Sequence, residues 1–440
     1  AGLFSGGEPG VWLSNQYSNT GVDLARVDQR ALFPEGFFTP DTNNQPRPGT
    51  AEGLSPIQTT EVNLTDPDFK INQIFRTNLA VEQRLPWNLV GTVEFIYSNN
   101  LHDIDYQNLN LGPENTNVRL SDGRPFYSDV VEGDDGSFSV RRVDASENFT
   151  NVILLTNTNV GEQWSLTGQL RKEFSDGWFG DISYTYSDGT SVNDGTSSRA
   201  ISNWQFNEVP GDPNNAPGAR TLFISKHRII GSASYRLNYG TRHSTTFSVI
   251  YEGRQGNPLT YAYFTPGFVS YSANGDFRGG NDLVYVPASE DDVNVVSNNW
   301  EELNAFIEAN PALRENRGQI VPRGYGDQPW VNQFDIRVTH NIRTFGTQSL
   351  DISFDVLNFG NMLGNIIGKD DWGVQRFASF GNVTELTFLG YDWDLAADGA
   401  IEGTPRISFD PDRVPTNIDQ FNVSNTNSRW RAQLGVRYSF

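Results

Sequence analysis

Apolar and polar side chains alternate along the last twelve residues of the chain. Successive side chains of a strand point to opposite sides of a sheet, so one face of this segment is apolar and the other is polar. The apolar face carries Trp430, Ala432, Leu434, Val436, Tyr438 and Phe440, and the polar face carries Arg429, Arg431, Gln433, Arg437 and Ser439. The pattern predicts a strand with lipid on one side and water on the other. An edge strand of a soluble sheet is the alternative.

The same alternation recurs in four pairs of segments, and each pair is joined by a short turn near Pro86, Asp176, Tyr239 or Gly346. These pairs predict four antiparallel hairpins. Their segments are Phe75–Leu85 with Leu89–Tyr97, Val152–Phe174 with Trp178–Tyr186, Ile229–Leu237 with Thr245–Tyr251, and Phe334–Val338 with Leu350–Val356. Together with the closing strand they make nine strands. The connections between hairpins are much longer than the turns within them, which is typical of barrels with short periplasmic turns and long extracellular loops.

Three long connections lack this alternation. Residues 1–69 are predicted to be an extracellular loop region, and residues 70–440 to hold the barrel strands with their loops. The segment from Asn358 to Asn427 is predicted to be a long polar connection. Residues 253–329 are long enough to predict a folded loop subdomain.

One helix is predicted inside residues 253–329. Asn298 and Glu301 form a capping-box pattern, and Pro311 is predicted to end the helix. Four apolar residues recur at helical spacing: Trp300, Leu303, Phe306 and Ile307. We expect this stripe to pack inside the loop, with a lid over the barrel mouth as the alternative.

Nine is an odd number of strands, and the first strand descends from an extracellular loop. A closed single-chain bacterial barrel has an even number of strands with both ends in the periplasm. We therefore expect an all-β transmembrane antiparallel barrel of which this chain is the C-terminal portion.

The composition argues against several classes of function. The formal charge of −21, from 53 acidic and 32 basic residues among 440, argues against a nucleic-acid partner, since phosphates require a basic surface. The chain has no cysteine, which excludes disulfides, thiolate metal sites and thiol nucleophiles. Mean hydropathy is −0.49, as expected when only one face of each strand is apolar. No apolar run is long enough for a transmembrane helix. No Gly-x-Ser-x-Gly nucleophile elbow is present either, so we expect that the protein is not an enzyme.

Charged residues of both signs fall on the face predicted to line the lumen. We expect them to contact a plug, with a merely solvated interior as the alternative. They are Arg76, Glu82, Arg84, Glu94, Arg171, Glu173, Asp335, Arg337, Asp351, Asp355, Arg431 and Arg437.

Metal binding is only weakly indicated. The best acidic cluster, a calcium candidate, is Asp392, Asp394, Asp398 and Glu402. Its spacing does not match the EF-hand loop, so surface acids without a metal are the expected reading. The four histidines lie far apart in the sequence and lack the pairing typical of zinc sites. We expect no cofactor other than this calcium candidate.

Several stretches resemble the Oar-like TonB-dependent outer-membrane receptors. They are VWLSNQYSNTG (Val11–Gly21), NQIFRTNLAVEQRLPW (Asn72–Trp87), LLTNTNVGEQWSLTGQLRKEF (Leu154–Phe174), YEGRQGNPLTYAY (Tyr251–Tyr263), GGNDLVYVP (Gly279–Pro287), WVNQFDIRVTH (Trp330–His340) and LDISFDVLNFGNMLG (Leu350–Gly364). The RYSF ending resembles the signal that the barrel-assembly machinery reads, which implicates Trp430, Tyr438 and Phe440.

The resemblance implies a 22-stranded barrel in the outer membrane of a Gram-negative bacterium. It further implies outer-membrane lipid as the surroundings, an N-terminal plug and remaining strands as partners, and energy from a TonB-type protein. The plug and the N-terminal domain that the resemblance implies are expected to be absent from this chain. The transported ligand would be bulky, and it would be taken up or exported. Two other readings remain: a barrel that acts as a surface scaffold or docking partner, and a soluble β-rich carbohydrate-binding protein.

Overall fold

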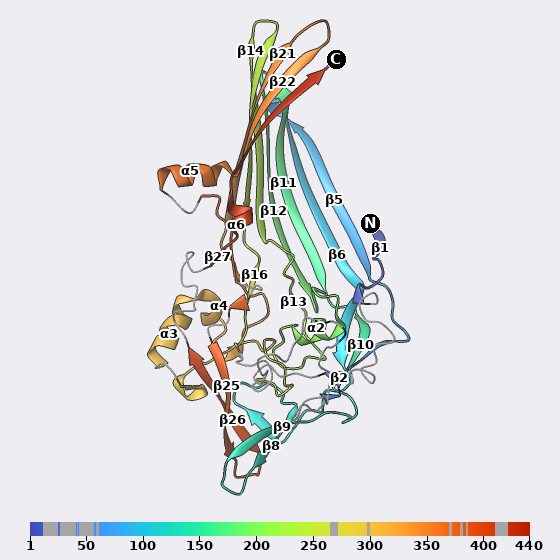
Figure 1. Ribbon diagram of the computed structural model, residues 1–440, viewed down its shortest axis with the longest axis vertical. Helices are drawn as coiled ribbons and strands as arrows, with labels where there is room; N and C mark the ends of the chain where they lie inside the picture. Colours follow the sequence, from blue (N-terminus) through green and yellow to red (C-terminus); the bar gives the residue numbers. More distant parts are fainter. Residues whose placement is uncertain are drawn as a thin grey trace.

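A computed structural model describes most of the chain. The described residues are 1–11, 25–26, 41, 43, 57–58, 61–264, 272–296, 300–368, 372–378, 382–383, 386–409 and 421–440. They form a tall, curved antiparallel sheet with a folded mass at one end (Figure 1).

The main sheet has the strand order β1-β5-β6-β11-β12-β14-β15-β21-β22-β28. Neighbours along this path are antiparallel throughout. The ten strands are β1 (Gly2–Ser5), β5 (Gln73–Leu85), β6 (Leu89–Asn108), β11 (Glu162–Ser175), β12 (Trp178–Ser191), β14 (His227–Tyr239), β15 (His243–Arg254), β21 (Val331–Arg343), β22 (Ser349–Leu357) and β28 (Arg431–Ser439). The four predicted hairpins and the closing strand are therefore confirmed.

Short turns join each hairpin at one end of the sheet. The first contains the 3₁₀ turn η1 (Pro86–Asn88). In the second, Asp176 and Gly177 both have positive φ, 54° and 84°, which is the arrangement of a type I′ turn and matches the twist of paired strands. All four turns lie towards the upper end of the sheet in Figure 1, and most of the folded loop structure lies at the opposite end, which we call the long-loop end.

The N-terminal region differs from the prediction of a loop. β1 pairs with the long-loop end of β5, from Gly2 opposite Arg76 to Ser5 opposite Gln73, so the main path has ten strands where nine were predicted. β4 (Glu61–Thr65) pairs in parallel with β10 (Asn151–Thr158), which also pairs with β6. A strand of four residues, such as β1, is too short to show an alternating pattern. Most of the predicted loop lies outside the described residues.

The registers give the sheet two unlike faces. Leu166 lies opposite Phe95 on one face, and Thr167 lies opposite Glu94 on the other. Apolar side chains on the first face are open to the surroundings: Leu79 is 70% exposed and Leu434 is 70% exposed. The alternation predicted from the sequence therefore holds across the sheet.

A second body, which we call the outer subdomain, lies at the long-loop end. It consists of the described parts of residues 115–143, 257–328 and 386–409. Its hydrophobic core includes Leu303, Val321 and Ile407, each 0% exposed. Its strands are β7 (Val118–Leu120), β8 (Ser128–Glu132), β9 (Phe138–Arg142), β16 (Pro258–Tyr261), β17 (Tyr285–Val286), β18 (Asn294–Val295), β19 (Gln319–Ile320), β20 (Gly326–Asp327), β25 (Leu386–Leu395) and β26 (Ile401–Phe409), with the 3₁₀ turn η2 (Glu290–Asp292).

The predicted helix is present as α3 (Trp300–Ala309), and Leu303 and Ile307 from its apolar stripe are buried in the core of the outer subdomain. This favours packing over a lid. Asn298, half of the predicted capping box, lies outside the described residues. Pro311 does not simply end the helix; it begins α4 (Pro311–Arg314), where Asn310 Oδ1 accepts the Ala312 N–H at 3.1 Å.

The segment before the closing strand is also more structured than predicted. It contains α5 (Phe359–Ile367) and the long hairpin β25–β26, which has four buried apolar residues near its open end: Leu386, Phe388, Ile407 and Phe409. The prediction of a polar connection was wrong for β25 and β26. Turn-forming polar residues on either side of this hairpin obscure the alternation of apolar and polar residues within its strands. The remaining elements are α2 (Ala200–Gln205), α6 (Asn425–Ser428), β2 (Ala25–Arg26), β3 (Ile57–Gln58), β13 (Ala219–Arg220), β23 (Arg376–Phe377), β24 (Asn382–Val383) and β27 (Asn422–Val423).

Candidate functional site

All twelve charged residues predicted to line the lumen fall on one face of the main sheet, by register or by strand alternation. They are Arg76, Glu82, Arg84, Glu94, Arg171, Glu173, Asp335, Arg337, Asp351, Asp355, Arg431 and Arg437. They are spread over six strands, so they form a polar wall and not a compact cluster.

Cross-strand contacts connect much of this wall. The Arg337 guanidinium holds the Asp355 carboxylate with both Nε and Nη2, the latter at 3.0 Å. Asn341 Nδ2 donates to Asp351 at 2.6 Å, and the backbone N–H of Asn358 donates to Asp335 at 2.7 Å. Polar residues outside these twelve extend the wall. Gln169 donates to Asp181 at 2.7 Å, and the hydroxyls of Thr167 and Thr185 are 2.9 Å apart.

The three residues of the predicted assembly signal lie on or beside the opposite, apolar face. Trp430 precedes β28, Tyr438 is paired opposite Leu350, and Phe440 follows the last strand residue. The Tyr438 hydroxyl donates to Gln348 Oε1 at 2.5 Å, which attaches the closing strand to the β21–β22 turn. Phe440 is 95% exposed.

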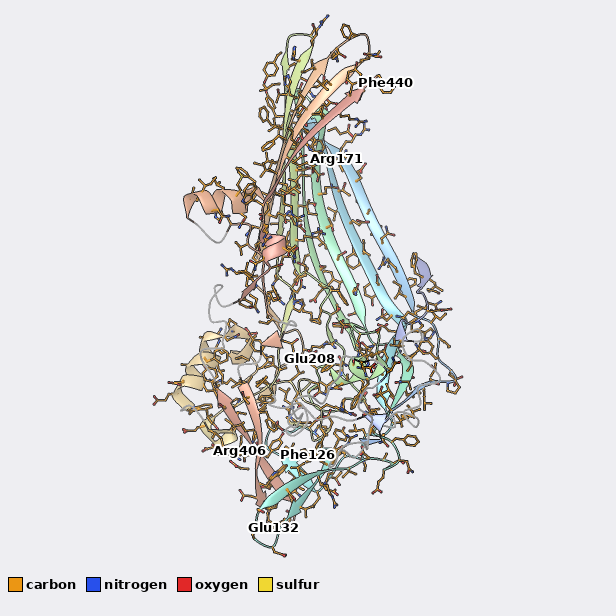
Figure 2. All side chains as sticks on the ribbon, viewed as in Figure 1. Phe126, Glu132, Arg171, Glu208, Arg406 and Phe440 are labelled. Carbon is orange, nitrogen blue, oxygen red and sulfur yellow. The ribbon has the colours of Figure 1, made fainter. Side chains whose placement is uncertain are left out.

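The outer subdomain contains a cavity of about 330 Å³ lined largely by aromatic rings. The Phe126 and Trp393 ring centroids are 5.5 Å apart, and those of Tyr391 and Trp393 are 5.0 Å apart. Phe126 and Arg406, which both line the cavity, lie at the far end of the molecule from Arg171 and Phe440 (Figure 2). We call this cavity the aromatic pocket. Its rings offer stacking surface suited to flat or ring-shaped ligands, and Arg406 in its lining is paired with Asp392 at 3.2 Å.

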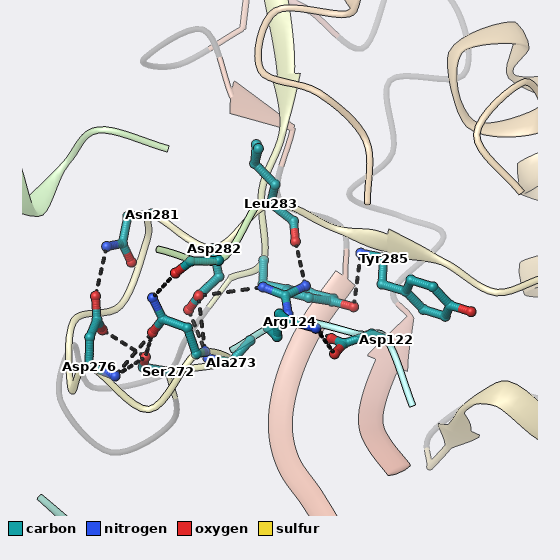
Figure 3. Close-up of polar contacts among 12 residues, drawn as sticks. Asp122, Arg124, Ser272, Ala273, Asp276, Asn281, Asp282, Leu283 and Tyr285 are labelled. Carbon is teal, nitrogen blue, oxygen red and sulfur yellow. Dashed lines mark hydrogen bonds and ion pairs between the residues drawn. The ribbon is translucent and has the colours of Figure 1, made fainter. Parts of the chain in front are cut away.

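Figure 3 shows a buried polar cluster around Arg124. The cluster adjoins the aromatic pocket, because Asp122 lies 3.4 Å from the hydroxyl of Tyr391, which lines the pocket. Arg124 Nε lies 2.6 Å from Asp122, and Arg124 Nη1 lies 3.6 Å from Asp282; the side chains of all three are 0% exposed. Arg124 Nη2 also donates to the Leu283 carbonyl at 2.9 Å. The Tyr391 hydroxyl, at the edge of the pocket, donates to the Ala273 carbonyl at 2.7 Å. The cluster thus ties three separate loops together.

The charges in this cluster are strongly coupled. Although burial favours the neutral form, the Asp122 carboxylate holds the pKa of Arg124 above its ordinary value. Burial, with help from the neighbouring Asp276 carboxylate, raises the pKa of Asp282 to about 7. Burial also raises the pKa of Asp276. Burial therefore shifts two of the carboxyl groups near Arg124 towards their protonated, neutral forms.

Comparison with known proteins shows the family to which the chain belongs. A family described as outer membrane beta barrel domain matches residues 2–385. The chain belongs to this outer membrane beta barrel domain family. The outer membrane transporter YddB from Escherichia coli is similar in structure, with 8% sequence identity and a TM-score of 0.34. That similarity covers 80% of this chain but only 33% of the YddB chain. No curated protein matches the chain.

Membership of the outer membrane beta barrel domain family places the chain in the outer membrane of Gram-negative bacteria. The apolar face of the sheet therefore contacts lipid. In such barrels the short turns face the periplasm and the long loops face outwards, so the outer subdomain and the aromatic pocket face the cell exterior. No helix in the described ranges is long and apolar enough to cross a membrane.

The calcium candidate is not assembled as a metal site. Asp392 lies 3.2 Å from Arg406 and accepts a hydrogen bond from Asn294, while Asp398 lies 2.7 Å from Arg119. These partners come from distant loops and could not be foreseen from the local spacing of Asp392, Asp394, Asp398 and Glu402. Within the part of the chain that the structure describes, no three His, Asp or Glu residues are arranged to hold a metal ion.

Two histidines that are far apart in the sequence meet in the sheet. His243 Nδ1 and His340 Nε2 are 3.4 Å apart, and the rings are stacked with centroids separated by 5.6 Å. The pairing of β15 with β21 brings them together near the periplasmic turns. The pair follows from the register of β15 against β21, which the spacing of histidines in the sequence does not indicate.

Proposed function

We propose that this chain forms C-terminal strands and outer loops of a TonB-dependent transporter that moves a bulky ligand through a plugged barrel. The observation that carries the proposal is the combination of one continuous polar wall with a folded, pocket-bearing subdomain at its outer end. A ligand captured at the aromatic pocket would be delivered to a wet, charged passage. The resemblance of several stretches to Oar-like receptors supports TonB as the energy source.

The two edges of the main sheet support a larger barrel. Within the described residues, β1 pairs only with β5, and β28 pairs only with β22. Each unpaired backbone N–H or C=O in lipid costs on the order of several kcal/mol. We propose that further strands close the sheet between these edges, and that a plug fills the lumen and contacts the polar wall.

Binding to TonB tests the energy coupling. Outer membranes from cells that make the whole protein are extracted in mild detergent and passed over the immobilised periplasmic domain of TonB. Specific retention is expected, while a porin from the same extract should pass through as the control. Absence of retention would reject TonB dependence and favour the scaffold reading.

A separate experiment tests the barrel itself. A folded barrel migrates differently on a gel before and after boiling, and a soluble carbohydrate-binding protein would not be recovered in outer membranes at all.

A further inference from the structure

Helix α5 packs on the protein through glycines and not through its apolar residues. Of the nine residues in this described helix, only Gly360 and Gly364 are buried. Ile366 is 71% exposed and Ile367 is 50% exposed. They belong to one apolar face whose members recur at helical spacing: Phe359, Met362, Leu363, Ile366 and Ile367. In a water-soluble protein such a face packs against the core, so α5 is turned the opposite way.

The glycine side of α5 lies against the lipid-facing side of the main sheet. A Cβ placed on Gly360 would lie 3.7 Å from the ring of Phe334. Phe334 belongs to the apolar face of the sheet, where its ring packs on that of Tyr251 with the centroids 4.7 Å apart. The helix projects sideways from the sheet, across the direction of the strands (Figure 1). The exposed isoleucines of α5 therefore extend the surface that lipid covers.

The position of α5 along β21 matches the outer edge of the membrane. Phe334, which contacts the helix, and Arg343, at the periplasmic turn, bound a segment of ten residues. A strand needs about 9–11 residues to cross the hydrocarbon layer. Beside the contact, Trp330 Nε1 and the Tyr251 hydroxyl both donate to Asn332 Oδ1, at 3.0 and 2.8 Å. Tryptophan and tyrosine with hydrogen-bonded polar tips are typical of the boundary between membrane and water.

A polar joint at the start of α5 holds the helix in place. Asn358 is 3% exposed and has a φ of 53°, so the chain turns sharply from β22 into the helix. Its Nδ2 donates to the carbonyl oxygens of Gly373 and Ser428, each at 2.8 Å. A Cβ on Gly373, whose φ is 71°, would overlap Asn358 Oδ1, so this position requires glycine. The helix is thus positioned from its base, which leaves its apolar side chains available for other contacts.

We propose that α5 is an interfacial helix whose apolar face inserts among the acyl chains of the outer leaflet. A helix with one apolar face lies in the plane of a membrane with that face in the boundary between headgroups and acyl chains. Lipid is the occupant because the helix adjoins a sheet face that lipid already covers, at the depth where the strands leave the hydrocarbon layer. The helix anchors the outer ends of β21 and β22, where the sheet continues into the outer subdomain.

Single-cysteine labelling of the whole protein tests this location, because these 440 residues contain no cysteine that would compete for the label. Ile366→Cys is labelled with an environment-sensitive fluorophore, and the protein is reconstituted into phosphatidylcholine vesicles that contain nitroxide-labelled lipid. We expect blue-shifted emission, little quenching by aqueous iodide, and strong quenching by a nitroxide near the headgroup. A nitroxide at the end of the acyl chain should quench less, since an interfacial helix is buried only about 5–10 Å deep.

Three further labelled variants complete the test. Asn365→Cys, on the polar side of the helix, is the matched control and should be quenched by iodide. Leu434→Cys, on the lipid face of β28, should be quenched best by the nitroxide at the end of the acyl chain. Ile367→Cys should behave as Ile366→Cys does, which keeps the test decisive if one variant fails to fold. Iodide quenching of both isoleucine positions would place the helix in water, and protection of both from iodide and nitroxide would show a protein cover; either result would overturn the proposal.

Discussion

Leucine side chains lie in opposite surroundings in the two parts of this molecule. Leu79 and Leu434 on the main sheet are each 70% exposed, whereas Leu303 and Leu313 in the outer subdomain are 0% and 1% exposed. On the sheet, lipid covers the apolar residues, so no protein layer is needed. In the outer subdomain the chain must cover them itself, and it does so with helices and strands from three loops.

Charged residues show the reverse contrast. The Arg337 side chain on the polar wall is 61% exposed, while the side chains of Asp122 and Arg124 in the outer subdomain are fully buried. A charge on the wall remains hydrated when its partner is lost, but a buried charge does not. The same type of substitution should therefore have very different costs in the two regions.

The largest effect is expected for Arg124→Ala. It leaves the Asp122 and Asp282 carboxylates buried without a cation, which should cost about 3–5 kcal/mol. The outer subdomain should then be cut rapidly by protease on intact cells, while the boiled and unboiled forms of the barrel still migrate differently. Arg141→Ala removes an exposed ion pair with Asp129 in the same subdomain and should change neither readout. Equal sensitivity of both variants would contradict the contrast.

A charge on the lipid face should come next. Leu434→Arg places a cation in the membrane and should cost roughly 2–4 kcal/mol near the midplane. Gln433→Arg adds the same charge one residue away, on the polar wall, and should have little effect. The yield of folded barrel in outer membranes distinguishes them, and equal yields would mean that the two faces of β28 do not meet different solvents.

Removal of Phe440 should act on assembly and not on the finished fold. Phe440 is 95% exposed and makes little contact that would stabilise the sheet. We expect several-fold less barrel to reach the outer membrane, with normal resistance to unfolding for the fraction that does. Gln433→Ala is the control and should assemble normally. A barrel that assembles at the usual level without Phe440 would remove its role as a signal.

The smallest effect is expected for Arg337→Ala on the polar wall. The Arg337 side chain is 61% exposed and the Asp355 side chain is 10% exposed. Because Arg337→Ala removes an exposed side chain and opens the Asp355 carboxylate to water, loss of the contact should cost less than about 1 kcal/mol. Urea unfolding of the purified protein in detergent measures it, and the Arg337→Ala/Asp355→Ala double variant reports the coupling. A cost comparable with that of Arg124→Ala would show that the wall is drier than proposed.

The two regions also differ in what the sequence can reveal. A period of two is a local property, so β11–β12 and β28 were predictable from neighbouring residues alone. The pairing of β7 with β26, where Val118 lies opposite Ile401, has no local signature. The ion pair of Arg119 with Asp398 likewise joins two separate loops and has no local signature.

The pairing of β7 with β26 sets an order of events during folding. The Arg119–Asp398 contact joins residues 279 positions apart in the chain. Contacts of such long range form late, because the entropy of closing the intervening chain must be overcome first. The hairpins of the main sheet lie between these two residues in the sequence. Once formed, they lower the entropy cost of the contact, because they place the ends of the loops side by side. A completed outer subdomain thus reports that the strands beneath it are already in register, and an external ligand would find a finished binding surface only on a correctly assembled wall.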